Sequence, residues 1–283
     1  MEDSRALCVM VGRCFTADVA YLLLHSEQFC RRFRIKAYTS VATPNLDAEF
    51  QAILRDLETA SLVIYQPAAW ATWGNDNLFS QLVGRIPAAT QRITFPYPTF
   101  HAMWPFHASD PRAGKVVDEF GDPNSLLYHY ADANVIRMAR SGVEPSAAFS
   151  QYMAMNVNEL GDLDGLMDYF LADQRPKEDE TDIKIIDFVL DNFRRERLFL
   201  CINHGSNRLL FHMANQILER TGCRALPLEL RDQLSEMTPP EIPIHPGVAR
   251  HFGISWATPE TRYRIDSRRY WTFEEYVYGM ARP

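Results

Sequence analysis

The first hundred residues alternate between short apolar runs and amphipathic helical stripes, and this alternation constrains the fold more than any other feature. Residues 6–11, ALCVMV, read as a buried strand, and residues 15–29 carry apolar side chains at helical spacing. Further strand patterns are RFRIKAY, ASLVIYQP and QRITFP, and further helical patterns lie at residues 45–57 and 75–86. This order predicts an α/β fold, built on a small parallel sheet with helical crossovers.

The rest of the chain changes character. Residues 126–194 form a mostly helical segment, which we interpret as an insertion. It is interrupted at residues 172–182 by the charge run ADQRPKEDETD, expected to be a solvated loop. A strand, a turn and a helix return at residues 197–222, and the Pro-rich segment 227–283 is predicted to be irregular. We expect a single domain over residues 1–283.

Composition excludes several classes of protein. The chain has 283 residues with a net charge of -7, which argues against a general nucleic-acid binder with its basic face. No apolar run approaches the roughly 20 residues that cross a bilayer, and the acidic, polar start MEDSRALC is no signal peptide. The five cysteines show no CxxC spacing, so we expect neither a disulfide framework nor a metal site. These features favour a cytoplasmic protein.

The most informative local feature is the spacing Gly12-x-Cys14, between the first strand and the first helix. Ligands of open parallel sheets bind beyond the carboxyl ends of the strands, where Cys14 is placed. A helix start favours an anion, so we expect a lowered pKa and a nucleophilic thiol with nearby N–H donors for an oxyanion. Most cysteines are instead small buried apolar residues. That reading is preferred for the other four, Cys8, Cys30, Cys201 and Cys223.

A nucleophile needs a base, and three of the eight histidines are expected at the same edge of the sheet. His101 and His107 follow the fourth predicted strand, and His204 lies in the turn INHGSN. Any one of them is also compatible with a purely structural role, so the identity of the base stays open.

Amide and hydroxyl side chains at this edge are further candidates. Gln66 ends the third predicted strand, where its carboxamide could donate to an oxyanion, orient a substrate or make an ordinary loop hydrogen bond. Ser206 is predicted to be a helix N-cap rather than a nucleophile. Asn207 and Arg208 either face the pocket or simply begin the helix.

Several segments in this order resemble the WcbI-type polysaccharide-biosynthesis proteins: VMVGRCF, ASLVIYQ, FPYPTFHAMWPFHASDP and INHGSNRLLFHMANQILERTG. The resemblance implies an acetyltransferase of bacterial capsule assembly that binds coenzyme A, with the family's Gly and Cys at Gly12 and Cys14. Arg13 and Phe15 replace the family's Asn and Gln. The turn is also similar in topology to that of SGNH hydrolases, in which a Ser stands at the Cys position.

Coenzyme A carries phosphates and an adenine, so its site needs cations and flat apolar surfaces. The tail segment TRYRIDSRRYW supplies the best candidates, Arg268, Arg269 and Tyr270, unless it is only a solvated or interface strand. Arg13 and Arg208 are the alternatives. A Gly-rich nucleotide loop is missing from the sequence, which disfavours ATP and NAD.

Together with these features, the resemblance implies an acetyl-coenzyme A-dependent O-acetyltransferase acting on a sugar of a capsular polysaccharide or its precursor, in contact with other enzymes of capsule assembly. Cys14 either forms an acetyl-enzyme or only lines the pocket while a histidine activates the sugar hydroxyl. Two rival readings are a cysteine-dependent esterase or hydrolase and a non-catalytic coenzyme A-binding scaffold.

Overall fold

The computed structural model describes residues 4–39, 46–67, 82–114, 126–236, 240–266 and 268–282. The chain forms two compact units. The first comprises residues 1–98, 173–189 and 205–237, and the second comprises residues 99–172, 190–204 and 238–283. The expectation of a single domain stays a prediction.

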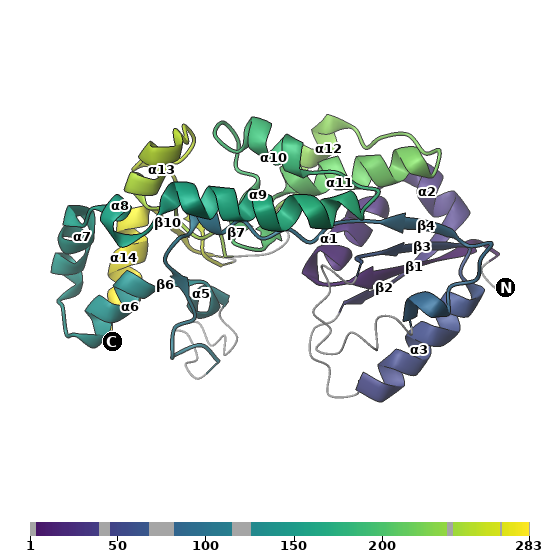
Figure 1. Cartoon of the computed structure of the whole chain (residues 1–283), viewed down its shortest axis with the longest axis horizontal. Helices are drawn as coiled ribbons and strands as arrows, with labels where there is room; N and C mark the ends of the chain where they lie inside the picture. The colour runs from purple at the N-terminus through teal and green to yellow at the C-terminus, as the bar shows by residue number, and fades with distance from the viewer. Residues whose placement is uncertain are drawn as a thin grey trace. The chain divides into compact units, whose positions relative to one another are not determined.

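The first unit is built on a four-stranded parallel sheet, which confirms the predicted α/β fold (Figure 1). Its strands are β1 (Ala6–Gly12), β2 (Phe33–Thr39), β3 (Leu62–Tyr65) and β4 (Gln91–Thr94). Their spatial order is β2-β1-β3-β4. The chain therefore leaves β1 in one direction to form β2 and returns to its other side to form β3, so a topological switch point lies between β1 and β3.

Helices cover both faces of this sheet (Figure 1). On one face, α1 (Cys14–Leu23) packs against α11 (Asn207–Arg220) and β2. On the other, α3 (Leu46–Thr59) contributes Ile53 and Leu57 to a core with side chains of β1 and β3. The helix predicted at 45–57 is thereby confirmed, whereas most of the one predicted at 75–86 lies outside the described residues.

The single helix predicted at residues 15–29 is wrong, because the structure divides it. Helix α1 ends at Leu23, and α2 (Glu27–Arg32) begins after Ser26. The Ser26 side chain accepts a hydrogen bond from the backbone N–H of Phe29 at 3.4 Å, so a serine inside the apolar stripe caps a new helix.

The charge run at residues 172–182 is not a solvated loop. Most of it belongs to α9 (Leu163–Asp179), which is followed by α10 (Ile186–Asn192). Glu178 is 7% exposed, and its Oε1 accepts hydrogen bonds from the backbone N–H groups of Ile185 and Ile186, the latter at 2.9 Å. The buried carboxylate satisfies donors at the start of α10, which explains how a charged residue is held inside.

The second unit is mostly helical around an aromatic core. Its helices include α5 (Leu126–His129), α6 (Ala133–Arg140), α7 (Pro145–Ala154), α8 (Val157–Leu160), α13 (Pro246–Phe252) and α14 (Phe273–Ala281). Phe100 contacts Phe170, Phe193 and Phe199, with ring centroids 4.7 to 5.5 Å apart. The predicted helical middle segment is thus confirmed.

Pairs of short strands lie outside the four-stranded sheet, in the second unit except for Gly205. They are β5 (His107–Ala108) with β6 (Ala131–Asp132), β7 (Phe199–Cys201) with β8 (His204–Gly205), and β9 (Tyr263–Arg264) with β10 (Tyr270–Trp271). The strand predicted near residue 200 therefore exists, but it pairs with β8 and not within the four-stranded sheet.

The prediction of an irregular segment at 227–283 is wrong in part. It contains α12 (Leu228–Gln233), α13 and α14, besides β9 and β10. Helix α14 begins with a capping box, in which Thr272 and Glu275 each bind the other's backbone N–H.

No helix among the described residues has the length and apolarity needed to cross a membrane.

Candidate active site

The carboxyl ends of β1 and β3 meet at the topological switch point, the place where open α/β sheets bind ligands. Gly12 is the last residue of β1, and Cys14 is the first residue of α1. Gln66 follows β3 directly. The predicted Gly-x-Cys turn therefore stands where the strand order reverses.

Gln66 ties this turn to its surroundings. Its Oε1 accepts a hydrogen bond from the backbone N–H of Arg13 at 2.6 Å, and its Nε2 donates to the carbonyl of Pro96 at 3.2 Å. The side chain is 0% exposed, so it braces the loops that follow β1 and β4. We therefore assign Gln66 a positioning role, whereas an oxyanion donor would have to face the substrate.

Gly12 is required by close packing. A Cβ added there would lie 2.5 Å from Gln66 Oε1 and 2.5 Å from Thr16 Oγ1, closer than side chains approach one another. The absence of a side chain at Gly12 is what lets Gln66 reach the backbone of Arg13.

The expectation of a lowered pKa at Cys14 is wrong. Burial raises the pKa of the Cys14 thiol above its ordinary value, and the Asp18 carboxyl raises it further. The N–H of Cys14 itself, Arg13 and the Tyr97 hydroxyl act in the opposite direction without reversing the shift. Sequence reasoning missed Asp18, although its i,i+4 spacing on the helix was a usable signal.

Arg13 offers positive charge beside the thiol. It is the N-cap residue of α1, and its own side chain makes no capping hydrogen bond. Its guanidinium lies 5.5 Å from the ring centroid of Tyr97, which follows β4. Tyr97 is a second residue of this site that the sequence analysis did not identify. The first turn of α1 therefore presents backbone N–H groups next to a cation and a thiol, which suits a carbonyl or phosphate oxygen.

The start of α11 is held by its own contacts. Asn207 is 4% exposed, donates through Nδ2 to the carbonyl of Leu234 at 2.9 Å, and gives its backbone N–H to Glu236 Oε2 at 2.7 Å. Ser206 is the N-cap residue, as predicted, but its hydroxyl makes no capping hydrogen bond. The Glu236 carboxylate instead accepts the hydrogen bond from the first backbone N–H of α11. Arg208 lies 4.9 Å from the ring centroid of Phe188.

The three candidate histidines are brought together in the second unit. The ring centroids of His101 and His107 are 6.4 Å apart, those of His107 and Tyr130 are 5.7 Å apart, and those of Tyr130 and His204 are 5.5 Å apart. Tyr130 thus links two candidates far apart in the sequence. Gly12, Arg13, Cys14 and Gln66 form the corresponding group of the first unit.

The histidines differ in their chemistry. Burial lowers the pKa of His107, the nearby His129 carbonyl raises it, and His101 lowers it again. His107 Nε2 lies 3.3 Å from that carbonyl, so it carries the proton and leaves Nδ1 as an acceptor. Burial lowers the pKa of His204 to about 4, and its Nδ1 lies 3.1 Å from Cys201 Sγ. His204 is therefore the weaker base.

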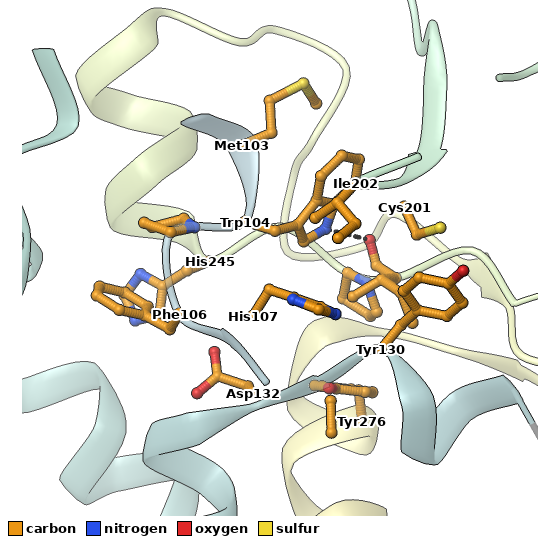
Figure 2. A pocket seen from close by; sticks show the side chains of 14 residues that line it. Met103, Trp104, Phe106, His107, Tyr130, Asp132, Cys201, Ile202, His245 and Tyr276 are labelled. Carbon is orange, nitrogen blue, oxygen red and sulfur yellow. Dashed lines mark hydrogen bonds between the residues drawn. The ribbon is translucent and has the colours of Figure 1, made fainter. Parts of the chain in front are cut away.

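A small cavity adjoins the rings of His107 and Tyr130 (Figure 2). It measures about 20 Å³, and its lining includes His107, Tyr130, Asp132, Cys201 and Tyr276. This volume holds about one water molecule and no larger ligand. Cys201 is 1% exposed, in keeping with the structural reading of that cysteine. Of the other three, Cys8 and Cys223 are buried and Cys30 is half-buried.

Among the tail arginines, the side chain of Arg269 is engaged by its neighbours. Arg269 pairs with Asp266, and its guanidinium lies 5.2 Å from the ring centroid of Trp271. Arg268 gives its backbone N–H to Asp266 Oδ1 at 2.7 Å, and Tyr270 is 50% exposed.

Within the described residues, no group of three His, Cys, Asp or Glu side chains is arranged to hold a metal ion.

Comparisons with known proteins agree with this architecture. The profile of a protein family described as polysaccharide biosynthesis enzyme WcbI matches residues 7–226. A solved structure of WcbI, described as a novel polysaccharide biosynthesis enzyme in its native form without a disulfide bond between coenzyme A and Cys14, is similar with a TM-score of 0.73. The alignment covers 98% of this chain and 89% of that chain at 17% identity, which shows the shared fold. No curated protein matches the sequence.

Proposed function

Because this chain belongs to the WcbI family of polysaccharide biosynthesis enzymes, we propose that it is a cytoplasmic O-acetyltransferase using acetyl-coenzyme A. The acceptor is a sugar of a bacterial capsular polysaccharide or its precursor. The observation that carries this proposal is the place of Cys14, at the switch point of the sheet and at the N-terminus of α1. The similar structure, whose description names coenzyme A together with Cys14, supports the same location.

The residues of the switch point fit a thioester. The N–H groups of the first turn of α1 suit the thioester carbonyl oxygen, which gains negative charge during acyl transfer. Arg13 places a positive charge beside the Cys14 thiol and suits a phosphate oxygen. Arg208, and in the second unit Arg268, Arg269 and Tyr270, are the further candidates for the phosphates and the adenine.

In a covalent route, the Cys14 thiolate attacks the thioester carbon, the carbon–sulfur bond breaks, and coenzyme A leaves as a thiolate that takes up a proton. A histidine then accepts the proton of the sugar hydroxyl, whose oxygen attacks the acetyl group and releases Cys14. In a direct route, the sugar oxygen attacks the thioester itself. The raised pKa of Cys14 favours the direct route, with Cys14 lining the pocket beside the thioester sulfur.

His107 is the best candidate for the base in both routes. Its lowered pKa keeps the ring neutral at pH 7, and the orientation of Nε2 toward the His129 carbonyl leaves Nδ1 to accept a proton. His101 and His204 remain candidates, although the pKa of about 4 makes His204 a poor proton acceptor.

Calorimetric titration with coenzyme A and acetyl-coenzyme A tests the binding. Saturable binding by the wild type is expected. We expect about tenfold weaker binding after Arg13→Ala, because a charged hydrogen bond to phosphate is lost. The double variant Arg268→Ala/Arg269→Ala tests whether the tail arginines contribute to coenzyme A affinity. Arg55→Ala, a change at an exposed arginine, is the control. Absence of binding to the wild type would contradict the proposal.

Transfer is measured with isotope-labelled acetyl-coenzyme A and capsular oligosaccharides. Label on the sugar supports the transferase, and label on the protein that disappears in Cys14→Ser but persists in Cys30→Ser supports the covalent route. Release of acetate that needs Cys14 but no sugar would indicate an esterase. Binding of coenzyme A without any turnover would indicate a scaffold.

A further inference from the structure

The second unit holds a cavity of about 330 Å³ that none of the chemistry above uses. Arg112 lines it from the loop after β5, Arg140 from the last turn of α6, and Arg282 from the end of α14. Helices α6 and α14 pack against each other (Figure 1). The volume lies at the lower end of the range for small-molecule sites.

One arginine is fixed by the fold. Arg112 donates from Nε and Nη2 to the two oxygens of Asp110 at 3.0 and 2.8 Å. It also donates to the carbonyls of Met280 at 2.9 Å and Arg282 at 2.6 Å. Its guanidinium lies 4.8 Å from the ring centroid of Tyr128. Arg112 therefore joins the loop to the end of α14 and sets the shape of this wall.

The charge of the wall remains positive. Asp110 is 4% exposed; burial raises its pKa, but the bonds from Arg112 and the charge of Arg140 hold the pKa below its ordinary value. Asp110 is therefore ionised at pH 7 and neutralises one arginine. Three guanidinium groups and one carboxylate give the described lining a net charge of +2. No acidic side chain among the described residues forms an ion pair with Arg140 or Arg282.

The rest of the lining is apolar. Ile136 and Ala139 lie on α6, one turn and one residue before Arg140, and Pro111 lies on the loop. A ligand that fits needs about two negative charges on one end and a compact body that can rest on an aliphatic wall. A phosphate monoester has this charge, and its oxygens match the paired N–H groups of arginine.

We propose that the cavity between the loop at Asp110–Arg112, α6 and the end of α14 binds a small phosphate monoester such as a sugar phosphate. Arg140 and Arg282 bind the phosphate, and Arg112 holds the loop and the end of α14 in place around it. This site does not depend on the proposed acetyltransferase chemistry. A phosphate group of coenzyme A has the same chemistry, so the test must separate the two sources.

The test is calorimetric titration of the full chain with inorganic phosphate, glucose 6-phosphate, glucose and coenzyme A. We expect saturable binding of glucose 6-phosphate, no binding of glucose, and weakening at high ionic strength. Arg140→Ala and Arg282→Ala should each weaken binding roughly tenfold. The matched control is Arg137→Ala, which removes the same charge one turn earlier on α6 outside the cavity lining.

Each outcome decides the matter. If the cavity variants weaken glucose 6-phosphate but not coenzyme A, the site takes a separate phosphate ester. If they weaken coenzyme A alone, the phosphate belongs to the cosubstrate. The inference is overturned if the wild type binds no phosphate ester, or if the Arg137 variant loses as much affinity as the cavity variants. Circular dichroism of each variant establishes that it is folded.

Discussion

At the scale of single residues, the thiol of Cys14 is governed by competing influences, of which burial is the largest. The helix start and Arg13 favour the thiolate, but burial and Asp18 outweigh them. Burial also raises the pKa of Asp18 to about 6, so its charge is nearly complete at pH 7 and partly lost below. Asp18 therefore restrains the reactivity of Cys14 most strongly above pH 6.

Asp18→Asn should lower the pKa of Cys14, because it removes the negative charge one helical turn away. The measurement is the rate of Cys14 alkylation by iodoacetamide against pH, read by mass spectrometry of the Cys14 peptide. The midpoint should move to lower pH, and the rate at pH 7.5 should rise. The exposed change Asp191→Asn serves as the control. An unmoved midpoint would show that Asp18 does not act on the thiol.

Gly12→Ala should destabilise the protein by about 1–3 kcal/mol, because its Cβ would overlap Gln66 and Thr16. Gly84→Ala is the control, since a Cβ there has nothing within 4 Å. Denaturant unfolding of both variants measures the difference. Equal stability would mean that the turn can open to accommodate the methyl group.

At the scale of elements, charged residues in this fold cap helices as well as facing solvent. Glu178 accepts the first N–H groups of α10, and Asp132 accepts those of Asn134 and Val135 at the start of α6. Both carboxyls belong to one helix or strand and satisfy donors of the next. The periodicity of the sequence assigns such charged residues to the surface, because it carries no information about the backbone N–H groups that they bind after folding.

Glu178→Ala should cost about 1–3 kcal/mol, the typical cost of leaving buried donors unsatisfied. Glu178→Gln keeps an oxygen acceptor and should cost clearly less. Urea unfolding of the two variants beside wild type gives both values. If the alanine and glutamine variants were equally stable, the capping contact would contribute nothing.

At the scale of the whole molecule, buried acids and buried histidines oppose each other in the dependence of stability on pH. Burial raises the pKa of Asp18 and of Asp132 to about 6, so folded protein binds these protons more tightly and loses stability as pH rises from about 4 to 6. Burial lowers the pKa of His204 and His245 to about 4, so stability falls as pH drops from about 6.5 to 4.

These four groups should therefore contribute little net pH dependence of stability between pH 4.5 and 6, since each shift corresponds to about 3 kcal/mol and the two pairs have opposite signs. Asp18→Asn/Asp132→Asn removes the acids, and Asn preserves the cap of α6. This variant should lose stability steeply as pH falls through the same range. Thermal unfolding across pH 4.5–7 tests it, and parallel curves for both proteins would refute the balance.

The sequence by itself determined the sheet and the location of the thiol. The four strands, the helix at 46–59 and the Gly-x-Cys turn follow from local patterns, in which buried strands and helix starts leave their own periodicity. Gly12 could also be recognised from the sequence, because a position where other atoms approach the backbone closely leaves no room for a side chain. The resemblance in VMVGRCF and the later segments indicated the family, which the profile match over residues 7–226 confirms.

Only the tertiary structure decided what the environment does to those residues. The pKa of Cys14 depends on burial and on Asp18, the role of Gln66 depends on the Arg13 N–H and the Pro96 carbonyl, and none of these is encoded in local spacing. The same holds for the cluster of His101, His107, Tyr130 and His204, and for a cavity lined by arginines from residues 112, 140 and 282. Local pattern records which residues prefer to be inside, whereas desolvation and charge act between residues that meet only after folding.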